Sequence, residues 1–132
     1  LDFQLSQRGQ PGYDLVSLLQ DVRRDVSGAT EAAMIRRFVR ATGADAAAFG
    51  AAYAVLGAQR ALRILGIFAR LCLVAGKPNY VRLIPRVWGQ LQRNLAHPAL
   101  APMAEICAGL LPEPTDEILQ RIGAQCGKTP MR

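Results

Sequence analysis

The stretch from Asp45 to Gly76 constrains the fold more than any other part of this sequence. Asp45 is suited to cap a helix, and Gly76 followed by Lys77-Pro78 is suited to end one. We therefore expect a single helix reaching about Ala75, much longer than the average of about 11–12 residues. Its first half is rich in alanine and glycine, and its second half carries large apolar residues on more than one side. Such a helix should be the centre of the fold, with neighbours on several faces.

Apolar residues at helical spacing predict further helices on both sides of this central one. The expected ranges are residues 13–26, 30–43 with Thr30 as cap and Gly43 as terminator, 80–96, 102–111 and 116–122. Pro85 falls inside the fourth helix, where it should cause a kink or a restart. The prediction is an all-α fold of about five to six helices around one long central helix, with a frayed tail over residues 127–132. Because Arg60, Arg63 and Arg70 interrupt the central helix, we do not expect it to span a membrane.

Composition is consistent with one domain, because 132 residues with 51% hydrophobic content can bury a core. The net charge is +6, and no acidic residue lies between Asp45 and Glu105, although seven basic residues do. One explanation is a solvated face with acidic partners elsewhere, such as Glu113, Asp116 and Glu117, or acids in a part of the protein that this sequence does not include. The other is the wall of a substrate cleft that faces a neutral or anionic ligand.

Several single residues have structural explanations. The three cysteines, Cys72, Cys107 and Cys126, have no metal-ligand spacing, so Cys72 and Cys107 should be buried thiols in a protein of the reducing cytoplasm. Trp88 is expected to anchor the core, with sugar stacking as the alternative. His97 precedes a proline and has no partner acid nearby, so it should be a helix-end residue and not a base.

Two aspartates near the amino end are candidates for function. Asp2 lies between Leu1 and Phe3, at what the pattern predicts to be the end of a short strand. An acid in that position can present an oxygen ligand to magnesium, although a strand end or an N-cap explains it as well. Asp14 opens the first predicted helix and could be its N-cap.

A resemblance adds to these observations. Residues 1–24 (LDFQLSQRGQPGYDLVSLLQDVRR), and blocks at 56–60, 64–70, 84–88 and 95–100, resemble the aminoglycoside-phosphotransferase-like kinases. The likeness is strongest to members that phosphorylate cell-wall amino sugars such as N-acetylmuramate and N-acetylglucosamine. It implies the helical C-terminal lobe of a protein-kinase-like fold, an ATP- and Mg²⁺-dependent sugar phosphotransferase, Asp2 as a ligand of the magnesium ion, and Asp14 as support for the catalytic loop. The family usually has another acid after Gln4, where this sequence has Leu5.

The resemblance also implies parts that this sequence does not contain. Such kinases need a nucleotide-binding lobe and a catalytic loop with an aspartate base. We therefore expect the chain to be the C-terminal portion of a larger enzyme, partnered by an N-terminal kinase lobe and inactive alone. Residues 1–12 would form the metal loop, 13–112 the helical substrate lobe, and 113–132 a C-terminal helix and tail.

Three polar residues of the central helix are the candidates for substrate binding. Gln59, Arg60 and Arg63 lie on a helix that should be packed on several sides, so they need polar partners or a cleft. An arginine-bearing wall suits a neutral or carboxylate-bearing sugar better than a polycationic aminoglycoside. The alternative function, of another class, is a stand-alone basic helical module that binds an acidic protein or nucleic acid. No DNA-reading motif or interleaved aromatic residues support that alternative, and we expect neither nucleic acid nor a membrane as a partner.

Overall fold

The computed structural model describes residues 9–129, and within that range the chain is all helical. The α-helices are α1 (Gly12–Leu19), α2 (Gly28–Thr42), α3 (Ala46–Leu73), α4 (Ile84–Leu95), α5 (Ala101–Leu110) and α6 (Asp116–Ala124). Two 3-10 helices, η1 (Pro78–Leu83) and η2 (Pro98–Leu100), precede α4 and α5. The predicted all-α fold class is therefore confirmed for the described residues, with six α-helices of which α3 is the long central one.

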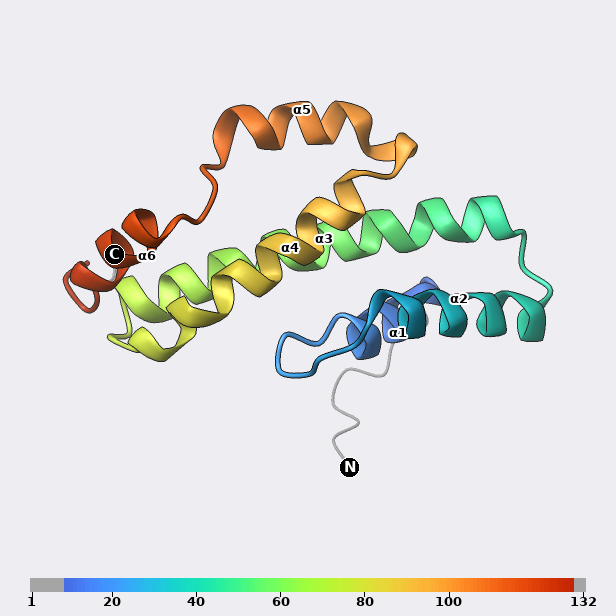
Figure 1. Cartoon of the computed structure of the whole chain (residues 1–132), viewed down its shortest axis with the longest axis horizontal. Coiled ribbons are helices and arrows are strands. Elements are labelled where there is room, and N and C mark those ends of the chain that lie inside the picture. Colours follow the sequence, from blue (N-terminus) through green and yellow to red (C-terminus); the bar gives the residue numbers. More distant parts are fainter. Residues whose placement is uncertain (1–8, 130–132) are drawn as a thin grey trace.

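Helix α3 is the centre of the fold, as its sequence predicts (Figure 1). The side chain of Asp45 accepts a hydrogen bond from the backbone N–H of Ala48 at 2.7 Å and so caps its start. The helix contacts α1 and α2 along its first part, and α4, η1 and α6 along its second part. By length and composition α3 could also cross a membrane, but the core helix of a globular protein meets the same criterion.

The first two helices differ from the sequence prediction. Helix α1 ends at Leu19 and not near residue 26, because the chain turns so that Gln20 and Val22 are both buried in the interior. Apolar spacing alone had suggested that the helix continues through Val22. Helix α2 is capped by Ser27, whose side chain accepts a hydrogen bond from the backbone N–H of Thr30, so Thr30 is not the cap.

The region around Pro85 matches its prediction. Six residues of 3-10 helix precede α4, and α4 starts one residue before the proline, where the missing backbone donor is harmless. Trp88 is half-buried and packs against the main core. His97 is a helix-end residue, because its Nδ1 accepts a hydrogen bond from the backbone N–H of Ala99 at 3.2 Å.

The core has two parts. The larger surrounds the second half of α3 and includes Phe68, Val87 and Leu91. The smaller joins α1 to the start of α3 through Val16, Phe49 and Tyr53, with partly buried residues of α2 packed against it. Gln20, Glu31 and Asn94 are buried polar residues, and they bring α1, α2 and α4 together at one place along α3.

The end of the described chain returns to α3. The backbone N–H groups of Gly127 and Thr129 donate to the carbonyls of Cys72 and Leu73, at 2.9 and 3.0 Å. Gly127 approaches Gly76 closely, and both have positive φ angles, which glycine adopts without strain. The predicted frayed tail is therefore wrong for residues 127–129.

Candidate functional site

The predicted substrate-side arginines lie where α3 meets α1. The Nε of Arg60 donates to the hydroxyl of Ser17 at 3.4 Å, and a terminal nitrogen of Arg63 donates to the hydroxyl of Tyr13 at 3.0 Å. We call these four residues the α1–α3 ridge. Arg60 is half-buried and Arg63 is exposed, so both guanidinium groups keep donors available to solvent.

Gln59 does not join this ridge. It is exposed, and no hydrogen bond of its side chain occurs within residues 9–129. The structure therefore brings two of the three predicted substrate-side residues into one polar cluster with α1. The partners Tyr13 and Ser17 were not predicted, although both lie one helical turn apart on the helix that the sequence placed here.

Asp14 is exposed in the first turn of α1, where a carboxylate interacts favourably with the helix dipole. It is not the N-cap, because that position is Pro11. Instead, the side chain of Gln10 accepts a hydrogen bond from the backbone N–H of Gly12 at 2.7 Å. Asp14 shares α1 with Tyr13 and Ser17, so it lies beside the α1–α3 ridge.

Asp2, the predicted magnesium ligand, lies outside the described residues. Within residues 9–129 no group of three or more histidine, cysteine, aspartate or glutamate side chains is arranged to hold a metal ion. A magnesium ion is commonly bound through only one or two protein carboxylates, so the role of Asp2 stays a prediction.

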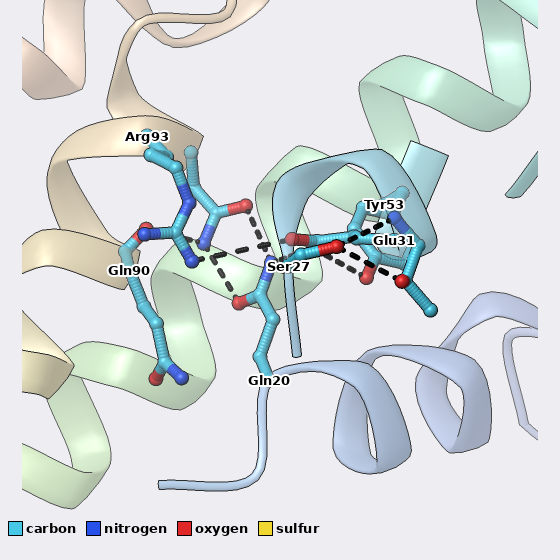
Figure 2. Close-up of polar contacts among 8 residues, drawn as sticks. Gln20, Ser27, Glu31, Tyr53, Gln90 and Arg93 are labelled. Carbon is cyan, nitrogen blue, oxygen red and sulfur yellow. Dashed lines mark hydrogen bonds and ion pairs between the residues drawn. The ribbon is translucent and has the colours of Figure 1, made fainter. Parts of the chain in front are cut away.

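The most extensive polar arrangement within residues 9–129 is buried, and no pattern in the sequence predicted it (Figure 2). Gln20 and Asn94 pair through their amides, with Gln20 donating at 3.1 Å and Asn94 donating at 3.0 Å. Gln20 also donates to Glu31 Oε1 at 2.8 Å, and the hydroxyl of Tyr53 donates to the same oxygen at 2.8 Å. We call Gln20, Glu31, Tyr53 and Asn94 the central polar network.

The central polar network stabilises a carboxylate that is only 11% exposed. Its nearest basic group is Arg93, whose nitrogen lies 4.0 Å from Glu31 Oε2, so hydrogen bonds and not a close ion pair compensate the buried charge. Burial raises the pKa of Tyr53 far above its ordinary value, and the hydrogen bond to Glu31 acts in the same direction. Tyr53 is therefore a permanent donor and not a base at neutral pH.

A glycine makes the network possible. A Cβ atom on Gly57 would lie 2.5 Å from both amide atoms of Asn94, closer than non-bonded atoms approach. The small-residue half of α3 was predicted to permit close helix approach, and this contact is an instance of it. Asn94 follows Val87 and Leu91 in the core-facing register of α4, which is the signal that could have revealed it.

Two basic residues of the acid-free stretch have acidic partners within residues 9–129, and these partners are not the ones named in the prediction. Arg86 donates to Asp25 Oδ1 at 3.0 Å and to the carbonyl of Val22 at 2.9 Å, and Arg93 faces Glu31. None of the ion pairs within residues 9–129 uses Glu113, Asp116 or Glu117. The α1–α2 loop also contains its own pair, in which a hydrogen bond from Arg23 lowers the pKa of Asp21.

The cysteines are free thiols, as predicted, with Cys72 and Cys107 buried. Cys126 donates a hydrogen bond to the carbonyl of Cys72 at 3.2 Å, which links the end of α6 to the end of α3. Burial, together with the neighbouring Cys126 thiol, raises the pKa of Cys72 to about 11. A thiol with that pKa is almost entirely protonated at neutral pH and is a poor nucleophile.

Similarity to characterised proteins indicates the class of protein to which the chain is related. The chain is 48% identical over 104 residues to a kinase of Caulobacter vibrioides, which covers 78% of the chain and 29% of that protein. It is 35% identical over 118 residues to a kinase of Pseudomonas aeruginosa and 35% identical over 119 residues to one of Neisseria meningitidis. These two matches cover 83% and 84% of the chain, and 35% and 36% of the proteins. No family model matches the chain.

The chain is thus a helical segment homologous to sugar kinases, which confirms the resemblance seen in the sequence. All three relatives are named N-acetylmuramate/N-acetylglucosamine kinase, so the homology is to that particular kind of enzyme. The chain spans about a third of the length of these relatives.

Proposed function

We propose that the chain is the C-terminal part of an ATP-dependent phosphotransferase that acts on a cell-wall amino sugar of the N-acetylmuramate or N-acetylglucosamine type. The observation that carries this proposal is the 48% identity to an N-acetylmuramate/N-acetylglucosamine kinase over 78% of the chain. Residues 1–12 contribute the metal loop, 13–112 the helical substrate lobe, and 113–132 a C-terminal helix and tail. The nucleotide-binding lobe and the catalytic base belong to the rest of the enzyme, which works in the cytoplasm.

Asp2 is proposed as one ligand of the magnesium ion, which neutralises charge on the nucleotide phosphates when it is bound. Asp14 supports the catalytic loop. Its exposure in the first turn of α1 supports this role, because the carboxylate is free to accept hydrogen bonds from another part of the enzyme.

Arg60 and Arg63 of the α1–α3 ridge are proposed to face the sugar, with Gln59 beside them. The ridge presents two guanidinium groups and two hydroxyls, which suit the hydroxyls, acetamide and carboxylate of an acetylated amino sugar. A polycationic aminoglycoside would be repelled by the same arginines. The alternative of a basic module for nucleic acid has less support, because Arg86 and Arg93 face acids of this chain.

The test is a kinase assay on the longer enzyme that contains this chain, with N-acetylmuramate, N-acetylglucosamine and kanamycin as acceptors. We expect phosphate transfer to the acetylated sugars, loss of turnover in Asp2→Asn, and no turnover by the 132-residue chain alone. Preference for kanamycin, or turnover by the chain alone, would contradict the proposal.

The ridge is tested by Arg60→Ala, with Arg70→Ala as the matched control on the same helix. Arg70 is exposed and outside the ridge. Loss of one charge-assisted contact to the sugar should raise its KM about tenfold, because such hydrogen bonds contribute about 1.5–3 kcal/mol. Arg70→Ala should leave KM within about twofold. An unchanged KM in Arg60→Ala would remove the arginine from the substrate site.

A further inference from the structure

A small cavity lies between α4 and the loop that joins α1 to α2. Its volume is about 100 Å³, and it is lined by Leu19, Arg24, Asp25, Val26, Arg86, Gln90 and Arg93. Three of the seven lining side chains are guanidinium groups and one is a carboxylate. The cavity is separate from the α1–α3 ridge, since none of its lining residues belongs to that ridge.

The spacing along α4 explains why these groups meet. Arg86, Gln90 and Arg93 stand four and three residues apart, so they share one face of the helix. That face is turned towards the α1–α2 loop, because Arg86 donates to the carbonyl of Val22 and to Asp25. The loop contributes Arg24 from the opposite side of the cavity.

Gln90 adds an uncharged amide donor to the arginines that line this cavity. The residue is 6% exposed, yet within residues 9–129 its side-chain amide makes no hydrogen bond, and only its backbone carbonyl accepts one, from Asn94. In Figure 2 its amide points away from the central polar network. None of the fully buried side-chain nitrogen and oxygen atoms within residues 9–129 lacks a hydrogen-bond partner, so the amide of Gln90 is accessible to solvent and can reach a ligand that enters the cavity.

The guanidinium groups of Arg24, Arg86 and Arg93 have more N–H donors than their partners in the protein use. Each arginine carries five N–H donors. Arg86 uses two of its nitrogens on Val22 and Asp25, Arg93 lies 4.0 Å from Glu31, and Arg24 lies 3.8 Å from Asp21. The side chain of Asp25 is 92% exposed, so it can move into solvent when an anion enters.

We propose that this cavity binds a small phosphate-type oxyanion, held by Arg24, Arg86 and Arg93 with the amide of Gln90 as a fourth donor. The volume admits one phosphate group but not a sugar ring or a nucleotide base. Phosphate is favoured over a carboxylate because its oxygens can accept hydrogen bonds from several guanidinium groups at once and it carries more charge. This inference does not depend on the proposed kinase function.

The experiment is calorimetric titration of inorganic phosphate into purified protein that contains the whole chain, at constant ionic strength set with chloride. We expect saturable binding of one phosphate, and weaker binding of acetate. Arg24→Gln should lower the phosphate affinity about tenfold, since it removes a charge-assisted contact. The matched control is Arg23→Gln, an exposed neighbour that does not line the cavity and should leave affinity unchanged.

A second pair of variants tests the amide of Gln90. Gln90→Leu keeps the size of the side chain and should lower the phosphate affinity severalfold. Gln92→Leu, on an exposed position of the same helix, should leave it unchanged. Absence of saturable phosphate binding, stronger binding of acetate, or equal affinity in Arg24→Gln and Arg23→Gln would each overturn the proposal. If Gln90→Leu fails to fold, the exposed Arg24→Gln pair still decides the question.

Discussion

The second half of α3 is enclosed by apolar side chains from η1, α4 and α6, whereas the first half has only a small apolar core with α1 and α2. In α2 the one buried side chain is a carboxylate, Glu31, and the apolar residues of that helix are only partly covered. Apolar packing therefore dominates in the C-terminal part, while the N-terminal part depends more on hydrogen bonds of the central polar network. The comparison teaches that one helix can be stabilised by two different means along its length.

The largest expected effect tests the apolar part. Leu91 is 0% exposed, so Leu91→Ala should leave a cavity and lower the free energy of unfolding by about 2–5 kcal/mol. Leu110→Ala is the control, because Leu110 is 75% exposed and should change stability by less than about 0.5 kcal/mol. Urea unfolding followed by circular dichroism measures both. Equal effects would contradict the assignment of Leu91 to the core.

The next effect tests the junction between the two parts. Gly57→Ala places a methyl group against the amide of Asn94, so α3 and α4 must separate or the amide pair with Gln20 must break. We expect a loss of about 1–3 kcal/mol in the free energy of unfolding. Gly66→Ala is the matched control, because a Cβ there meets nothing within 4 Å and alanine favours the helix. Destabilisation by Gly66→Ala alone would refute the steric argument.

The smallest effect tests the polar part alone. Tyr53→Phe removes one donor to Glu31 and should cost about 1 kcal/mol at pH 7. The pKa of Tyr53 is raised in the folded protein, so above its ordinary value of 10.0 the unfolded chain releases a proton that the native state retains. Tyr53 therefore lowers the free energy of unfolding as the pH rises above about 10, by up to about 1.4 kcal/mol per pH unit.

The measurement for Tyr53 is the free energy of unfolding between pH 7 and 11 in the wild type and in Tyr53→Phe. The variant should show a flatter decline above pH 10, and the two curves should converge there. Tyr13→Phe is the control, because the side chain of Tyr13 is 38% exposed. A decline in Tyr53→Phe as steep as that of the wild type would show that another group causes the alkaline loss.

Local signals in the sequence predicted much of the fold. The cap at Asp45, the terminator at Gly43 and the restart at Pro85 each depend on one residue and its near neighbours, and each prediction is confirmed. The end of α1 was predicted wrongly because it depends on distant partners. Gln20 is the C-cap of α1, and its side-chain amide pairs with that of Asn94, which lies 74 residues away in the sequence.

The candidate site was predictable only in outline. The sequence singled out Arg60 and Arg63 as polar groups on a packed helix, but not that Ser17 and Tyr13 are their partners. Such pairs depend on how α1 is rotated against α3, which helical spacing does not specify. Asp2 lies outside the described residues, and its role as a magnesium ligand stays a prediction.

The chain leaves α3 after Leu73, and the segment from Gly127 to Thr129 returns to the end of that helix. Since its N–H groups occupy the carbonyls of Cys72 and Leu73, unwinding the last turn of α3 and releasing α6 become one event rather than two. Proteases that cut frayed ends should therefore find both sites protected together or exposed together.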